Sequence, residues 1–292
     1  MISIVVISKD EPSLDDTLKE VQVQAAELDG GAEVIVVDAS QGRLRGIEQR
    51  HSTVRWIDFT APAGVRVSIP HQRNAGVAAA GGEVIVFTDA GCVPHERWLA
   101  TLTGAIAGQG ESVAAGLAVA PADSASHYGL EVARVQRSEY LDEAPTLNLA
   151  FRREAFAAVG GFDERFEYGS DLDFSWRLVD RGYRIRSVPE AVVEHDWGSS
   201  RRQLRRAYMY GRAKARLYAK HRRRRRRVWR EDPVVWVWPA FILGLPVTVV
   251  FPLYPLLLAV PAWRARRHGA VSVVADHLAY GVGVLSVLAE QR

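Results

Sequence analysis

The stretch IPHQRNAGVAAAGGEVIVFTDAGCVP, residues 69–94, contains a short run of apolar residues that ends in an acid. Within it, residues 83–89 (EVIVFTD) are β-branched or apolar nearly throughout, which is typical of a strand buried on both faces. Residues 2–8 (ISIVVIS) and 33–38 (EVIVVD) have the same character, and residues 13–28 between them carry apolar side chains at helical spacing. This order predicts an α/β fold with an open, mostly parallel twisted sheet flanked by helices.

The predicted strands end in polar residues. Ser8 to Glu11 follow the first run, and Asp38 and Asp89 end the two others. In open parallel sheets the ligand crevice lies beyond the carboxyl ends of the strands. We therefore expect these sequence-distant groups, Ser8 included, to meet in one cleft.

From about residue 101 to residue 141 the pattern of apolar residues is less regular, and a clear pattern returns at residue 148. Gly160-Gly161 then ends a short predicted helix. A second helix is predicted over residues 170–181, before Gly182, and an extended segment over residues 183–196.

The length of 292 residues allows one sizeable α/β core and an appendage of roughly 60 to 90 residues. We predict a first domain over residues 1–220 and a basic and apolar C-terminal region over residues 221–292. The first residues lack a basic segment before an apolar one and a small-residue cleavage site, so they are expected to form a strand and not a signal peptide. The single cysteine, Cys92, excludes an intramolecular disulfide framework and fits a reducing, cytosolic compartment.

Positive charge is concentrated near the C-terminus. Residues 201–230 hold 15 of the 37 basic residues and no acid, whereas the rest of the chain has 22 basic and 34 acidic residues. The arginine run Arg222 to Arg227 is followed closely by 31 residues without charge, 233–263. This adjacency favours anionic lipid headgroups over nucleic acid as the partner.

The uncharged stretch is too long and too rich in proline for one straight spanning helix. As a single helix it would be about 46 Å long, against roughly 30 Å of bilayer hydrocarbon. It contains six prolines, and basic residues flank both ends, so a re-entrant or interfacial pair of short helices is expected. Residues 270–289 are apolar, but Asp276 and His277 near their middle favour an interfacial helix.

Several polar residues are candidates for chemistry, each with a structural alternative. Asp89 is placed to bind ribose or a cation that carries phosphate oxygens, or else it is a turn acid. Asp171 and Asp173 lie near a helix start, where carboxylates are also favoured as caps. His195 follows a predicted strand, where a histidine is usually structural.

Taken together, ordered segments of the chain resemble the family 2 glycosyltransferases of the GT-A fold. The segments are VISKDEP, VIVVDAS, residues 69–94, residues 148–195 and RRAYMYGRAKARL, and they span about residues 1–220. The resemblance implies that the first domain is catalytic. It assigns the nucleoside base to Asp38, the donor pocket to Arg73 and Asn74, a DxD-type element to Asp89, the general base to Asp171, and a metal and diphosphate site to Asp89 with His195.

Two positions depart from the family pattern. Gly91 stands where the family usually has a second acid, so Mg²⁺ or Mn²⁺, the expected cofactor, loses a carboxylate ligand. Ser170 stands where a glutamate normally precedes the base, which removes a charge that would raise the pKa of Asp171. Alignment with that motif favours Asp171 over Asp173 as the base and leaves Asp173 as a substrate-binding candidate.

The expected reaction is direct displacement with inversion at the anomeric carbon, from a nucleotide-sugar donor. The expected acceptor is a lipid-linked or cell-envelope glycan, at the cytoplasmic face of the membrane. Arg202 belongs to a group of four arginines, 201, 202, 205 and 206, that lie mostly on one helical face. That face suits either a diphosphate or lipid headgroups.

Other classes of function remain in competition. The missing acid at Gly91 motivates a catalytically silent nucleotide-sugar-binding scaffold at the membrane. A nucleotidyltransferase would be expected to have a glycine-rich basic loop after the first strand, whereas SKDEPS is acidic and lacks glycine. Nucleic-acid binding would depend on the arginine run alone, because no recognised module accompanies it.

Overall fold

The computed structural model describes residues 1–121, 138–196, 200–226, 228–264 and 269–290. The chain forms two compact units, Met1–Trp197 and Gly198–Arg292. Helix α8 (Ser200–Lys220), which the sequence analysis counted with the first domain, belongs to the second unit.

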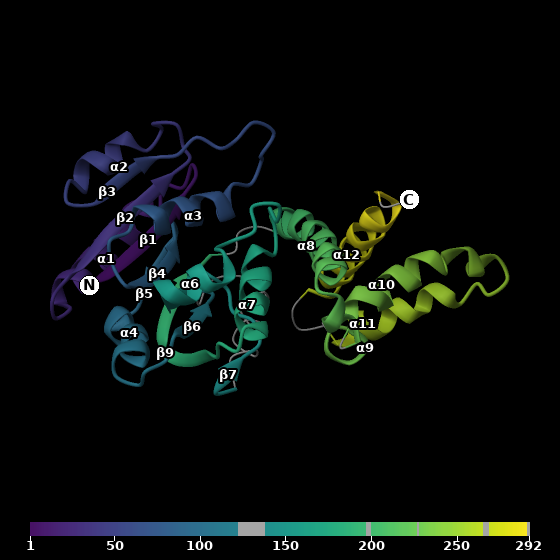
Figure 1. The fold of residues 1–292 in the computed structure, drawn as a ribbon. Coiled ribbons are helices and arrows are strands. Elements are labelled where there is room, and N and C mark those ends of the chain that lie inside the picture. Colours follow the sequence, from purple (N-terminus) through teal and green to yellow (C-terminus); the bar gives the residue numbers. More distant parts are fainter. Residues whose placement is uncertain (122–137, 197–199, 227, 265–268, 291–292) are drawn as a thin grey trace. The chain divides into compact units, whose positions relative to one another are not determined.

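The first unit is built on one open mixed sheet (Figure 1). Its strand order is β3-β2-β1-β4-β8-β6-β9-β5, and β7 pairs with β9. The strands are β1 (Ile2–Ser8), β2 (Ala32–Asp38), β3 (Arg55–Asp58), β4 (Val84–Asp89), β5 (Cys92–Pro94), β6 (Val113–Val119), β7 (Tyr140–Leu141), β8 (Asn148–Arg152) and β9 (Ile185–His195).

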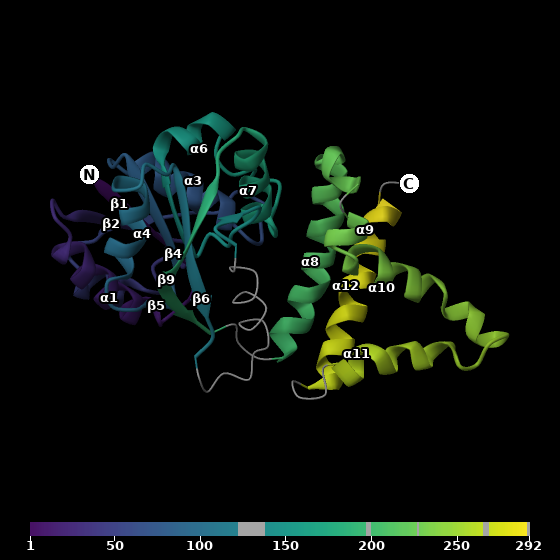
Figure 2. The same cartoon turned by 90° about the horizontal axis from the view of Figure 1, so that it is seen from below.

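Helices cover both faces of this sheet, because its central strands bury apolar side chains on both sides. Ile4 and Val6 of β1 pack in the cluster that contains the apolar stripes of α1 and α4, whereas Val5 and Ile7 pack with α3, α6 and α7. Figure 2 shows the sheet between these helices. The helices are α1 (Leu14–Glu27), α2 (Arg45–Arg50), α3 (Ile69–Ala79), α4 (Trp98–Ala107), α6 (Arg153–Val159) and α7 (Ser170–Asp180).

The expected α/β fold with an open sheet is confirmed, and the structure adds detail to the strand directions. Strands β1, β2 and β4 are mutually parallel, as the three apolar runs predicted, and the additional strand β3 is parallel to β2. Strand β8 lies antiparallel to both β4 and β6, and β9 returns parallel to β6. The second half of the sheet is therefore mixed, because its strands are not all joined by crossover helices.

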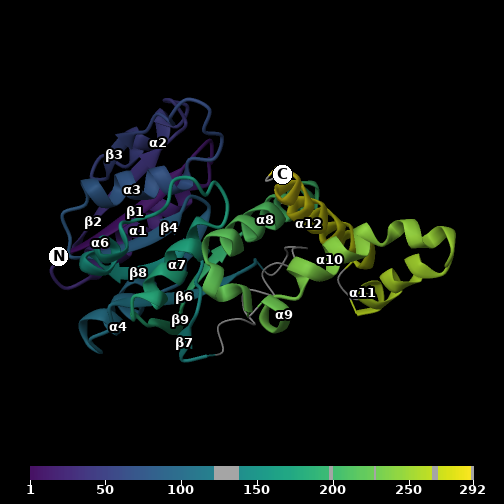
Figure 3. The same cartoon turned by 45° about the vertical axis from the view of Figure 1, so that its right-hand side comes forward.

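The second unit is helical. Helix α8 and helix α12 (Ala270–Glu290) lie side by side in Figures 1 and 3. The other elements are the 3₁₀ helices η1 (Arg222–Arg226), η2 (Leu245–Val249) and η3 (Tyr254–Leu258), and the helices α9 (Val228–Glu231), α10 (Val234–Leu243) and α11 (Ala259–Arg264).

Glycines let α8 and α12 approach closely. A Cβ added at Gly211 would lie 2.1 Å from the carbonyl oxygen of Tyr280, and one at Gly283 would lie 2.1 Å from that of Tyr208. Arg212 of α8 donates to Ser286 at 2.7 Å and to Glu290 at 2.7 and 3.0 Å. Backbone contact and charge pairing thus join the two helices along their length.

The uncharged stretch forms a hairpin of short helices, as its prolines predicted. Helices α10 and α11 are its two arms, and η2 and η3 lie between them (Figure 2). In the segment that connects the two arms, apolar side chains are exposed. Val249 is 87% exposed and Val250 is 88% exposed. Of the described helices, α12 is long and apolar enough to cross a membrane, with a mean hydropathy of 1.7.

In the first unit, Gly76 fixes the distance between α3 and the sheet. A Cβ at this position would lie 2.3 Å from Cγ1 of Val5, a fully buried side chain of β1. The same helix carries Arg73 one turn earlier, so the absence of a side chain at Gly76 decides how closely Arg73 approaches the strand ends.

We predict that Gly76→Ala destabilises the first unit by about 1–3 kcal/mol, because the added methyl group overpacks a rigid core. Denaturant unfolding measures the change. The matched control is Gly104→Ala in α4, where an added Cβ meets nothing within 4 Å. That change should stabilise by about 0.5–1 kcal/mol through helix propensity, and a loss of stability equal to that of Gly76→Ala would contradict the packing argument.

Candidate active site

Parallel pairing brings the predicted strand-end residues to one edge of the sheet. In the ladder between β1 and β2, Ser8 lies opposite Asp38, and in the ladder between β1 and β4, Ile7 lies opposite Asp89. Ser8, Asp38 and Asp89 therefore lie on three adjacent strands at their carboxyl ends, as the sequence analysis expected.

Asp38 is almost fully buried, with 1% of its surface exposed. Its Oδ1 accepts from the backbone N–H of Ser40 at 3.2 Å and from the Ser40 hydroxyl at 2.5 Å. Among the described residues, no partner lies within hydrogen-bond reach of its Oδ2. Burial raises the pKa of Asp38, and the bonds from Ser40 oppose this rise. A buried carboxylate oxygen without a partner is costly unless a ligand satisfies it.

The loops after β1 and β2 are tied together beside Asp38. Asp10 has a left-handed backbone, with φ of 56°, and its N–H donates to the Ser40 hydroxyl at 2.7 Å. Arg43 donates to the two carboxylate oxygens of Asp10 at 2.5 and 3.0 Å, which lowers the pKa of Asp10. The sequence analysis missed this pair, because neither residue is unusual in a loop.

Arg73 and Asp89 form a largely buried ion pair. Nη2 of Arg73 lies 2.9 and 3.2 Å from the two carboxylate oxygens of Asp89. The side chain of Arg73 is 5% exposed and that of Asp89 is 23% exposed. The rings of Phe87 and Phe162 each lie with their centroids 5.7 Å from the guanidinium carbon, so Arg73 is held between aromatic side chains.

Asp171 lies in the first turn of α7, after Gly169 in the left-handed conformation, and its Oδ1 accepts from the N–H of Leu172 at 2.9 Å. Burial raises its pKa, the positive charge of Arg73 lowers it, and the charge of Glu143 raises it. Arg73 is thus within electrostatic reach of Asp171 as well as bonded to Asp89. Glu143 lies in a loop that contains none of the motifs quoted above. Its negative charge raises the pKa of Asp171, which is the effect expected of the glutamate that Ser170 replaces.

Asp173 has a structural environment although it is only two residues away. Its side chain is fully buried and accepts a hydrogen bond from Nε of Arg177 at 2.7 Å. Arg177 also donates to the carbonyl oxygen of Val159, at the end of α6. This carboxylate joins α7 to α6, and its predicted role in substrate binding stays a prediction.

The other predicted residues are more scattered. Asn74 donates to the carbonyl oxygen of Phe162 at 3.0 Å and to Glu164 at 2.9 Å, and accepts from the Phe162 N–H at 2.9 Å, so it fixes the loop that holds the Phe162 ring. His195 ends β9 opposite Cys92. Arg202 lies in α8 of the second unit, and its side chain is outside the described part of the structure.

The donor set around Asp89 does not fit a divalent cation. In the described part of the chain, no group of three His, Cys, Asp or Glu side chains is arranged to hold a metal ion. Both oxygens of Asp89 face Arg73, and Gly91 brings no carboxylate. Burial, with the charge of Asp89, raises the pKa of Cys92 to about 12, so its thiol stays protonated at neutral pH and is a poor ligand.

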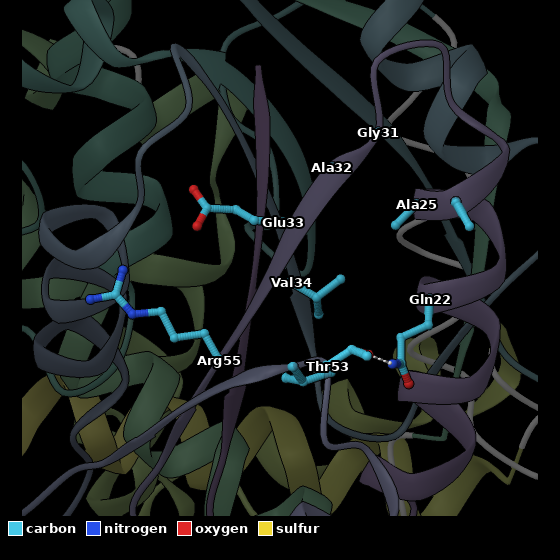
Figure 4. Close-up of a pocket in the computed structure, with 10 residues that line it drawn as sticks. Gln22, Ala25, Gly31, Ala32, Glu33, Val34, Thr53 and Arg55 are labelled. Carbon is cyan, nitrogen blue, oxygen red and sulfur yellow. Dashed lines mark hydrogen bonds between the residues drawn. The ribbon is translucent and has the colours of Figure 1, made fainter.

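A separate hollow of about 320 Å³ lies at the opposite edge of the sheet (Figure 4). Its lining includes Ala32 and Glu33 at the start of β2, and Gln22 of α1, which donates to Thr53 at 2.7 Å. Asp38 is at the other end of β2. None of the predicted site residues lines this hollow.

Two family models match the chain. The model described as glycosyl transferase family 2 matches residues 3–160, and that described as glycosyl transferase family group 2 matches residues 117–286. Each match covers more than half of the 292 residues. The chain therefore belongs to glycosyl transferase family 2, as the ordered segments indicated.

Curated proteins similar to this chain are named as glycosyltransferases. A pre-mycofactocin glycosyltransferase of Mycobacterium tuberculosis is 30% identical over 162 residues, which are 51% of this chain and 34% of that protein. Glycosyltransferase AglE of Haloferax volcanii is 23% identical over 176 residues, 58% of this chain and 57% of that protein. The chain thus spans about a third of the length of the mycobacterial relative.

Solved structures confirm the GT-A-like fold. The mannosyltransferase PcManGT from Pyrobaculum calidifontis, in complex with GDP-Man and Mn²⁺, has a TM-score of 0.73 at 19% identity, over 100% of this chain and 88% of that one. GalNAc-T7 with UDP, GalNAc and Mn²⁺ has a TM-score of 0.52 at 16% identity, over 74% and 50%. Both of these neighbours hold Mn²⁺, whereas the donor set described above does not suit a cation.

We predict opposite effects on stability for Asp171→Asn and Asp173→Asn. Since the pKa of Asp171 is raised in the folded protein, its charge opposes folding at neutral pH, and the neutral amide should raise the melting temperature. This gain should vanish as the pH falls through the pKa of Asp171, where the wild type is also neutral. Asp173→Asn removes one partner of a buried ion pair and should cost about 3–5 kcal/mol. Thermal unfolding from acid to neutral pH measures both, and equal effects would contradict the two environments.

Proposed function

We propose that this chain transfers a sugar from a nucleoside diphosphate donor to a hydroxyl acceptor, with inversion at the anomeric carbon. The single observation that carries the proposal is the position of Arg73, which bonds to the strand-end acid Asp89 at 2.9 Å and whose positive charge opposes the rise that burial causes in the pKa of Asp171. Membership of a glycosyltransferase family supports the same reaction.

The nucleoside end of the donor is assigned to the edge formed by Ser8 and Asp38. The free Oδ2 of Asp38 can accept an N–H of the base, and this bond would satisfy a buried oxygen that lacks a partner among the described residues. Asn74 keeps the loop of Phe162 against α3 and so acts as a positioning residue for Arg73.

The chemical step is assigned to Asp171. Its carboxylate takes the proton of the acceptor hydroxyl, while the acceptor oxygen forms a bond to the anomeric carbon and the bond from that carbon to the diphosphate oxygen breaks. The nucleoside diphosphate leaves with the electron pair, and the configuration inverts because attack comes from the opposite side. A raised pKa makes Asp171 a stronger base, and activity should therefore be lost on the acid side as it becomes protonated.

Asp171→Asn should abolish transfer, because the amide cannot take the proton, while nucleotide binding stays nearly unchanged. Product analysis with a panel of nucleotide sugars and hydroxyl acceptors measures transfer and the anomeric configuration, and calorimetry with nucleoside diphosphates measures binding. Retained turnover in this variant would reject the role of the base. A product with the donor's configuration would reject inversion.

A catalytically silent nucleotide-sugar-binding scaffold is the second candidate, and the glycine at position 91 is the observation that favours it. The two candidates differ in a simple assay. A scaffold binds the donor without hydrolysing or transferring it, whereas an enzyme slowly hydrolyses the donor when no acceptor is present.

The second unit is assigned to the surface of an anionic membrane at its cytoplasmic face. The hairpin between α10 and α11 exposes apolar side chains, and none of the arginines of η1 is buried. Apolar residues beside a basic run suit the boundary between headgroups and acyl chains. For α12 we propose an interfacial position. It packs on α8, whose Arg212 donates to Ser286 of α12, and a charged group at this contact would be costly inside the hydrocarbon. A lipid-linked or cell-envelope glycan acceptor follows from this location.

We predict that Val249→Asp with Val250→Asp weakens binding to phosphatidylglycerol vesicles by at least about tenfold, because two exposed apolar side chains become charged. Glutamine at the five positions of η1, Arg222–Arg226, should weaken binding to the same vesicles and remove its salt dependence. The control is Val23→Asp, at an exposed position of α1 in the first unit. Flotation measures all three, and equal binding by wild type and hairpin variant would exclude the hairpin as the contact.

A further inference from the structure

We propose that this chain binds the nucleoside diphosphate part of its donor without a divalent cation, because Arg73 already neutralises the one strand-end acid, Asp89, that a cation would use. The inference rests on the proposed function, since it concerns the same donor site. It departs from the two structural neighbours, both of which hold Mn²⁺.

Arg73 is buried in the site. Its side chain is 5% exposed, and its guanidinium lies between the rings of Phe87 and Phe162, which hold it beside Asp89. A cation at Asp89 would have to share the carboxylate with this fixed positive charge. Separating a buried arginine from its anion costs several kcal/mol, and a doubly charged ion beside it adds repulsion.

The loop after β4 contains a glycine where a second acid would be needed. Gly91 has a φ of +88°, and its N–H donates to the Thr17 hydroxyl at 3.0 Å. A Cβ placed there would lie 3.8 to 3.9 Å from Glu11 and Ser13, which is ordinary contact. The left-handed backbone favours glycine at this position, and the loop therefore lacks the second carboxylate.

The sequence offers few other metal ligands near Asp89. Cys92 is fully buried. His195 is the other predicted ligand, and divalent ions of this kind need about six ligands, most of them oxygens. Water and the phosphate oxygens of a donor commonly fill most of these places, and the protein usually supplies one or two carboxylates. Asp89, which is paired to Arg73, is the one carboxylate that the described end of β4 and its loop offer.

Charge on the diphosphate then has to be met by cations of the protein. Lys9 follows Ser8 directly and donates to the carbonyl oxygen of Arg66 in the loop before α3. Both side chains belong to loops at the carboxyl edge of the sheet, where the donor is assigned. Lysine and arginine bind phosphate oxygens directly and without an intervening ion.

The test is calorimetric titration of the full chain with UDP, GDP, ADP and CDP, in excess EDTA and in Mn²⁺. For the nucleotide that binds best, we expect the two dissociation constants to agree within about twofold. A loss of about tenfold or more in EDTA would overturn the inference and leave the proposed function intact. No binding of any nucleotide in either buffer would reject donor binding itself, and with it the inference.

A variant gives a second measurement. Arg73→Gln removes the charge that neutralises Asp89, so nucleotide binding in EDTA should weaken by about tenfold and become sensitive to Mn²⁺. Arg50→Gln, which changes an exposed arginine on α2, is the matched control and should leave both constants unchanged. Arg73→Gln binding as tightly as wild type, and with no response to Mn²⁺, would contradict the inference. If this variant does not fold, the comparison of EDTA and Mn²⁺ in wild type decides.

Discussion

The arrangement of the site depends on one buried positive charge, the guanidinium of Arg73. It pairs with Asp89 at the end of β4, lies between two aromatic rings and opposes the rise that burial causes in the pKa of Asp171. A buried arginine is stable only with its anion in place, so helix α3, strand β4 and the loop of Phe162 must fold around it together. The absence of a side chain at Gly76 makes this approach of α3 to the sheet possible.

The pair Asp171 and Asp173 illustrates how helix geometry gives two identical side chains different environments. Two residues apart on a helix, they point in nearly opposite directions. Asp173 is turned into the protein and bonds to Arg177, whereas burial raises the pKa of Asp171. Proximity in sequence therefore carried no information about which one is available to a substrate.

Much of the fold could be predicted from the sequence, because three apolar runs with polar ends allow few arrangements. Strands β1, β2 and β4 and helices α1 and α7 were predicted within a residue or two, and a pair of short helices was expected in the proline-rich stretch. The short strand β3 was not predicted, because two of its four residues are charged and they form no apolar run. The convergence of Ser8, Asp38 and Asp89 followed from parallel register alone. The ion pairs of Arg73 and Arg43, and the approach of Glu143, depend on how helices and loops pack, which a spacing pattern does not contain.

The close packing of α8 on α12 bears on how the C-terminal end can be altered. Deleting α12 would do more than remove an apolar segment, because Gly211 would leave a bare strip of backbone on α8 and Arg212 would lose both Ser286 and Glu290. A shortened chain would then expose the surface of α8 that packs on α12, beside an arginine whose charge is no longer neutralised. Removing this end to obtain a more soluble protein should therefore favour self-association. Replacing the exposed apolar side chains of the hairpin would leave the contact between α8 and α12 intact.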